Sequence, residues 1–135
     1  MSSHEPVSNH ASVVTVRPPA TVWVLTLFLG AMAVVCAGGA FLFAFPMGGL
    51  LGYIVGTLLI VFGIVYATIA WRLRRGERAV WIAALVLPIA HTLGLNTLDL
   101  VLYGAIPSED YPFMGVALAI VVLLLVPDTR RFFAT

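Results

Sequence analysis

The 135-residue chain is 61% hydrophobic and 10% charged, and its mean hydropathy is +1.08. Ordinary soluble domains are roughly 45–50% apolar and about 25% charged, so this composition excludes a water-soluble protein. The length leaves room for one compact bundle and no second domain. The net charge is only +1, and all seven cations are arginines placed by topology, which gives no basic surface for nucleic acid.

Residues 1–17 lack a helical period and are rich in polar residues, which predicts a disordered cytoplasmic tail. His4, Glu5 and His10 are too few ligands for a metal site, which needs about three or four. The apolar run after the tail is longer than the roughly 7–15 residues of a signal-peptide core, so we expect it to be retained. Cys36 is the only cysteine, so we expect a small buried hydrophobe, no disulfide and no cofactor.

Four apolar segments follow, and each reaches the roughly 20 residues that a membrane-spanning helix needs. We expect one transmembrane domain over residues 18–133, with helices at about 19–45, 49–72, 79–106 and 109–131. The exclusive use of arginine is compatible with a GC-rich prokaryotic genome. We therefore expect a multi-pass protein of a prokaryotic inner or plasma membrane.

The charges at the ends of these segments predict the orientation. Arg17 precedes the first segment and Arg130 and Arg131 follow the last, whereas Glu109 and Asp110 lie in a loop without a cation. Arginines near span ends stay on the cytoplasmic side. The expected fold is therefore an all-α transmembrane four-helix bundle of up-down-up-down order, with both termini in the cytoplasm.

Small residues recur along one face of each of the first two helices. Membrane helices associate through such faces, because lipid is as apolar as leucine and only close backbone approach adds contact. We expect a tight antiparallel hairpin, with one seam alternatively serving a homo-oligomer. The helix-packing residues expected are Gly30, Ala33, Ala37, Ala40, Gly52, Gly56 and Gly63.

The turn at residues 72–78 holds four of the seven arginines, Arg72, Arg74, Arg75 and Arg78. Their simplest role is to fix the topology. The alternative is that they bind anionic lipid headgroups, since each cation near such a surface is worth about 1 kcal/mol. The tryptophans at positions 71 and 81 bracket the turn as interfacial anchors.

The run Ala70-Trp71-Arg72-Leu73-Arg74-Arg75-Gly76-Glu77-Arg78-Ala79-Val80-Trp81 resembles the second-to-third helix turn of small four-span bacterial membrane proteins, some of them DoxX-like. The ending Leu123-Leu124-Leu125-Val126-Pro127-Asp128-Thr129-Arg130-Arg131-Phe132 is similar to their usual finish. The resemblance covers about half of the chain. It implies a fold but no activity, and it carries no functional residue over.

The third segment carries the polar groups. At about 100° per residue, Thr92, Asn96, Asp99 and Tyr103 share one helix face, and His91 lies on its shoulder. Threonine and asparagine in membranes most often hydrogen-bond to a neighbouring helix, for about 0.6 kcal/mol. A carboxylate in hydrocarbon costs about 2.5–3.5 kcal/mol, so Asp99 should face the bundle, a cavity or the outer interface. It is therefore structural, part of a binding or proton-linked pocket, or an oligomer contact.

No nucleophile, metal cluster or cofactor motif accompanies His91 and Asp99, so we expect no enzyme. We expect a non-enzymatic structural or accessory membrane protein that binds a partner protein or lipid. The alternative is an oligomeric small-molecule or proton-linked transporter that uses the polar face of the third helix. The direction in which that face points distinguishes the two hypotheses.

Overall fold

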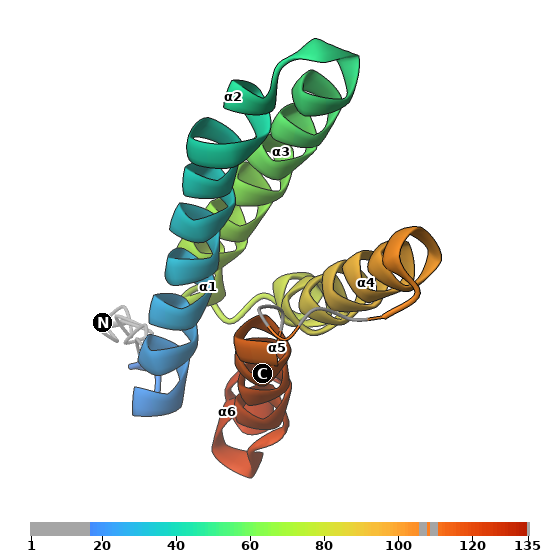
Figure 1. The fold of residues 1–135 in the computed structure, drawn as a ribbon. Coiled ribbons are helices and arrows are strands. Elements are labelled where there is room, and N and C mark those ends of the chain that lie inside the picture. The colour runs from blue at the N-terminus through green and yellow to red at the C-terminus, as the bar shows by residue number, and fades with distance from the viewer. Residues whose placement is uncertain (1–16, 106–107, 109–110, 135) are drawn as a thin grey trace, which may run out of the picture.

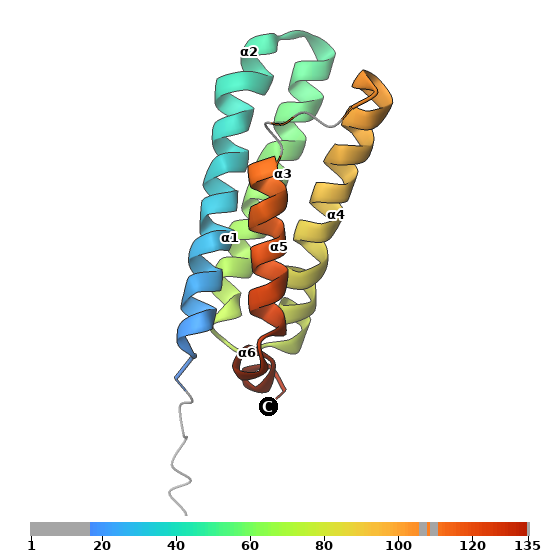
Figure 2. The ribbon, with the colours of Figure 1, turned by 60° about the horizontal axis from the view of Figure 1, so that its bottom comes forward.

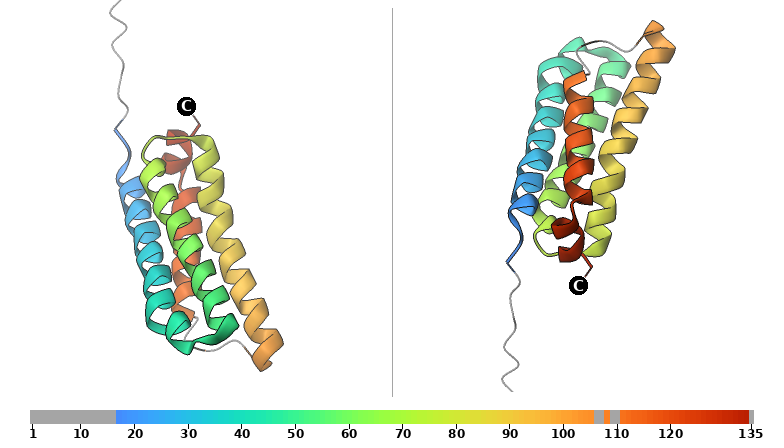
Figure 3. Two further views of the ribbon diagram at one scale, coloured as in Figure 1. Left: turned by 90° about the horizontal axis from the view of Figure 1, so that it is seen from above. Right: turned by 90° about the horizontal axis from the view of Figure 1, so that it is seen from below.

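The computed structural model describes residues 17–105, 108 and 111–134. These residues form helices and connecting turns, which confirms the expected all-α class for this part of the chain. Long helices lie side by side along one axis, and α6 lies across the end where α1 begins (Figures 2 and 3). The elements in chain order are α1 (Ala20–Gly39), η1 (Ala40–Ala44), α2 (Phe45–Met47), α3 (Gly49–Leu73), α4 (Arg78–Tyr103), α5 (Tyr111–Leu125) and α6 (Pro127–Phe132), as labelled in Figure 1.

Three stretches are long and apolar enough to cross a membrane, namely Ala20–Met47, Gly49–Leu73 and Arg78–Val101. The apolar helix Tyr111–Leu125 is shorter. At a rise of 1.5 Å per residue its 15 residues extend about 22 Å, less than the roughly 30 Å of a hydrocarbon core. The described residues are therefore all-helical, with three stretches long and apolar enough to span a membrane and one shorter apolar helix.

The last helix differs from the one expected over residues 109–131. Helix α5 ends at Leu125, and Val126 has an extended conformation with ψ of 134°. Pro127 then begins α6, because proline lacks the N–H that would continue the preceding helix and forces its predecessor out of the helical region. Residues 109 and 110 lie outside the described part of the chain, as do 1–16 with the histidines of the tail.

Helices α1 and α3 form the tight hairpin of the bundle. The turn between them uses Gly48 and Gly49, whose φ angles of 67° and 66° favour glycine. The first helix continues beyond its expected end at residue 45, through the π-helical η1 and into α2 at Met47. Figure 1 shows α1 and α3 running alongside one another.

Glycines of α3 bring the two backbones together. A Cβ added at Gly52 would lie 2.5 Å from the backbone oxygen of Ala44, and one at Gly63 would lie 3.2 Å from that of Ala33. A Cβ at Gly56 would overlap the ring of Phe45. The buried Ala40 and the half-buried Ala37 lie on the α1 side of this contact. A Cβ at Gly30, by contrast, would meet no atom within 4 Å, so that glycine lies outside the seam.

Side-chain exposure divides each long helix into two faces. The fully buried side chains include Leu25 and Leu29 of α1, Leu73 of α3 and Leu124 of α5, which meet in one core. Large apolar side chains on the opposite faces are open, for example Leu27 at 72% exposed. Such an extensive apolar exterior is suited to lipid and not to water.

Candidate functional site

Helix α4 carries the polar residues expected to form a site. Its first half contains Pro88, which is fully buried. A proline inside a helix removes the backbone hydrogen bond that the carbonyl of Ala84 would accept. His91 follows one turn later, and it is the most buried of the predicted polar residues whose side chains the structure describes, at 9% exposed.

His91 is held by two aromatic residues of α3. Its Nδ1 atom lies 3.1 Å from the hydroxyl oxygen of Tyr66, and the two groups share a hydrogen bond. Its ring also stacks on Phe62, with centroids 4.6 Å apart and an angle of 5° between the planes. Tyr66 is fully buried. The contact therefore satisfies two polar side chains inside the bundle and ties α4 to α3.

Thr92 and Asn96 border a small cavity next to His91. Its volume is about 20 Å³, enough for roughly one water molecule. Side chains from α1 and α5 close the other walls. The complete lining is Met32, His91, Thr92, Leu95, Asn96, Phe113 and Met114.

The predicted polar row is divided between different surroundings. His91 faces Tyr66, and Thr92 and Asn96 border the small cavity. Asp99 is partly exposed and forms no hydrogen bond or ion pair with any residue the structure describes. The side chain of Tyr103 lies outside the described part. The structure therefore joins His91, Thr92 and Asn96 and separates Asp99 from their contacts.

The arginines of the turn between α3 and α4 are engaged in different ways. Arg72 forms an ion pair with Glu77, with an N–O distance of 2.6 Å. The guanidinium of Arg74 lies over the rings of Trp23 and Trp71, at 4.9 and 5.5 Å from their centroids. Cation–π contacts of this kind anchor the charge at the bundle end. Arg75 is exposed, and it forms no ion pair with a described residue.

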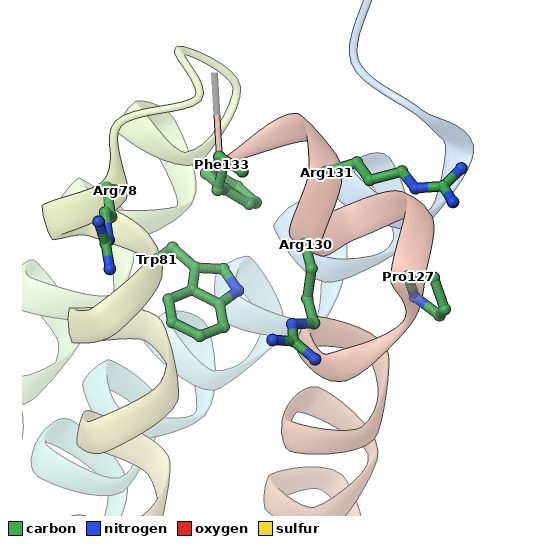
Figure 4. Close-up of a pocket in the computed structure, with 7 residues that line it drawn as sticks. Arg78, Trp81, Pro127, Arg130, Arg131 and Phe133 are labelled. Atoms are coloured by element: carbon green, nitrogen blue, oxygen red, sulfur yellow. The ribbon is translucent and has the colours of Figure 1, made fainter.

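Arg78 contributes to a larger pocket that is formed by the start of α4 and by α6 (Figure 4). It is an open depression with a volume of about 490 Å³, and the side chains of its three arginines are exposed. Arg78 and Arg130 lie on either side of Trp81, and Arg131 extends from the next position of α6 (Figure 4). We call this site the arginine pocket, and its lining is Arg78, Trp81, Pro127, Arg130, Arg131, Phe133 and Ala134.

Three buried or partly buried contacts hold the helices that form the arginine pocket against the bundle. The hydroxyl of Thr129, which is fully buried, donates a hydrogen bond of 2.8 Å to the hydroxyl of Thr21 in α1. Phe133 is 4% exposed and belongs to the main core. The indole N–H of Trp81 donates to the backbone oxygen of Leu124 at 3.2 Å, which joins α4 to α5. These contacts join α6 to α1 and to the core, and they join α4 to α5.

Among the described residues no acid forms an ion pair with the arginines of the arginine pocket, although Asp128 lies two residues before Arg130 in α6. No carboxylate lines the pocket, and Glu77, which precedes Arg78 in the chain, is paired with Arg72. Arg130 and Arg131 likewise form no ion pair with any described residue. The described residues also contain no group of three or more histidines, cysteines and acids that could hold a metal ion. The chemistry that this pocket offers is anion binding.

The sequence predicts that Arg130 and Arg131 lie at the cytoplasmic end of the last helix, but it does not indicate that they lie near Arg78. The sequence pattern that could have predicted their proximity begins at Pro127, which starts a new helix. Thr129 in that short helix and Phe133 directly after it, four residues apart, face inward, while the arginines between them face outward. This is an amphipathic turn, and its apolar side directs α6 back onto the bundle.

These features define a class: a small all-helical protein with several helices long and apolar enough to span a membrane, and with an arginine-lined pocket at one end. In comparisons with protein families, curated proteins and solved structures, none matches this chain. The resemblance of its arginine turn and C-terminal residues to DoxX-like proteins therefore stays a prediction.

Proposed function

We propose that the chain is a non-enzymatic accessory membrane protein whose arginine pocket binds the phosphate of an anionic lipid in the cytoplasmic leaflet. The observation that carries this proposal is the pocket itself, where Arg78 and Arg130 lie on either side of Trp81 (Figure 4) and no carboxylate is among the lining residues. In the proposed arrangement the helices alternate in direction across a prokaryotic cell membrane. Both termini then lie in the cytoplasm, as the positive-inside rule requires.

The position of the pocket along the bundle supports a lipid as ligand. Arg78 is the first residue of α4, and Arg130 and Arg131 lie in α6, directly after the apolar helix α5. Cations at these positions meet the membrane surface, where lipid phosphates lie. Trp81 adds an amphipathic ring, which prefers this interfacial depth.

The size of the cavity near His91 also favours an accessory role over the alternative, an oligomeric transporter. A pathway for a small molecule needs a continuous polar opening, whereas Thr92 and Asn96 border a space of only about 20 Å³ that side chains of α1 and α5 also line. His91 shares a hydrogen bond with Tyr66 and stacks on Phe62. These contacts support a polar group that joins helices.

Thermal unfolding in detergent with added lipid tests the proposal. Phosphatidylglycerol should raise the melting temperature of the parent protein more than phosphatidylcholine does, because a ligand bound only by the folded state stabilises it. The double variant Arg78→Gln/Arg130→Gln should lose this difference. The control Arg75→Gln removes an exposed arginine outside the pocket and should keep it.

Two results would overturn the proposal. One is an equal response of the parent protein to the anionic and the zwitterionic lipid. The other is an anionic-lipid response that Arg75→Gln reduces as much as the double variant does, because the effect would then come from net charge and not from the pocket.

A further inference from the structure

Resting on this proposed function, we infer that the arginine pocket selects a lipid with a terminal phosphate, a phosphomonoester or diphosphate, over a lipid with a phosphodiester headgroup. The first reason is charge. The pocket places the guanidinium groups of Arg78 and Arg130 on either side of Trp81 (Figure 4), and no carboxylate lines it. A phosphodiester carries one negative charge, whereas a phosphomonoester carries about 1.5 to 2 near neutral pH.

The second reason is the number of acceptor atoms. A guanidinium donates two parallel hydrogen bonds to a pair of phosphate oxygens when geometry permits. Arg78 and Arg130 extend on either side of Trp81 (Figure 4), so a phosphate between them is approached from two directions. A phosphodiester has only two unesterified oxygens for these donors, whereas a terminal phosphate has three.

The third reason is the composition of the walls. Trp81, Pro127 and Phe133 provide apolar surface beside the guanidinium groups. The volume of about 490 Å³ accommodates more than a phosphate group alone. The first atoms of a hydrocarbon chain can therefore enter with the phosphate, and this distinguishes a lipid from free inorganic phosphate.

The anchoring of α6 makes discrimination physically reasonable. Thr129 is bonded to Thr21, and Phe133 is inserted into the core. The backbone that carries two of the three arginines is therefore set before a ligand arrives. Preorganisation of this kind reduces the entropy that binding must overcome and makes affinity sensitive to the shape of the ligand.

Native mass spectrometry of the full chain in detergent tests the inference, with four probes compared at equal concentration. The probes are phosphatidic acid, phosphatidylglycerol, cardiolipin and inorganic pyrophosphate. Phosphatidic acid presents a terminal phosphate, and cardiolipin presents two phosphodiesters of similar total charge. We expect phosphatidic acid to bind at least about tenfold more tightly than phosphatidylglycerol, a difference of about 1.4 kcal/mol. Arg130→Gln should bring that ratio close to one, and Arg75→Gln should leave it unchanged.

Each contrary outcome has a distinct meaning. If phosphatidic acid and phosphatidylglycerol bind equally but both exceed phosphatidylcholine, the selectivity is wrong and the proposed function survives. If no anionic lipid exceeds phosphatidylcholine, both are wrong. Tighter binding of cardiolipin than of phosphatidic acid would overturn the inference, because affinity would then depend on total charge or on two phosphodiesters and not on a terminal phosphate. Pyrophosphate that binds as tightly as phosphatidic acid would show that the ligand is a soluble phosphate.

Discussion

Replacing Tyr66 by phenylalanine tests the polar contact at the centre of the bundle. The change removes one hydroxyl and keeps the ring that fills the fully buried site. Nδ1 of His91, 3.1 Å away, then loses its partner in a residue that is only 9% exposed. No other hydrogen bond to His91 is present among the described residues, so no other described side chain replaces the lost partner.

The expected magnitude follows from two limits. Hydrogen bonds between membrane helices contribute about 0.6 kcal/mol on average and about 1.7 at most. A buried polar group left without a partner costs about 1–3 kcal/mol. Because both groups are buried, we expect Tyr66→Phe to lower the free energy of unfolding by about 1–2 kcal/mol, a factor of roughly 5–30 in the folded-to-unfolded ratio.

Reversible unfolding in mixed detergent micelles measures this change, with Tyr53→Phe as the matched control. Tyr53 lies on the same helix but is 62% exposed, so its hydroxyl should contribute little. A double-mutant cycle with His91→Phe, which keeps a flat ring against Phe62, should give a coupling energy of about 1 kcal/mol. If the two tyrosine variants unfold alike and the coupling is zero, the contact does not stabilise the bundle.

Three further predictions concern packing, the acidic residue and topology. Gly52→Ala should destabilise the hairpin because its Cβ would lie 2.5 Å from a backbone oxygen, whereas Gly30→Ala meets no atom within 4 Å and should be neutral; equal unfolding temperatures would contradict the seam. Asp99→Leu should unfold like the parent protein, because no described residue depends on its carboxylate, and a loss of more than about 1 kcal/mol would reveal a buried partner. Ser108→Cys should react with an impermeant thiol reagent in intact cells and Arg75→Cys should not, both in a chain whose native cysteine is replaced by alanine; the reverse labelling would invert the proposed topology.

The long helices could be predicted because their signal is local. Continuous apolar runs longer than about 20 residues identify spans without knowledge of the partners. The expected helix over residues 49–72 and the observed Gly49–Leu73 differ by one residue. Gly104, with φ of 71°, ends α4 just before the expected boundary at residue 106, because glycine readily adopts this left-handed cap.

The candidate site was harder to predict because it depends on which helices become neighbours. A helical wheel places His91 on the shoulder of the α4 face that carries Asp99, but it does not show that Tyr66 of α3 lies opposite. The arginine pocket has the same difficulty, since Arg78 and Arg130 come together only when α6 folds back at Pro127. Gly30 shows the converse, because a small residue in a regular stripe is not enough to make a contact.

The lipid that remains bound after mild purification tests the central claim most directly. The protein would be extracted from a membrane of mixed phospholipids, and the retained lipids would be quantified per chain by mass spectrometry. The account predicts retention of an anionic phosphate-bearing lipid by the parent protein and by Arg75→Gln, and its loss from Arg78→Gln/Arg130→Gln while the fold persists. Retention of the same lipids in the same amounts by all three proteins would contradict it.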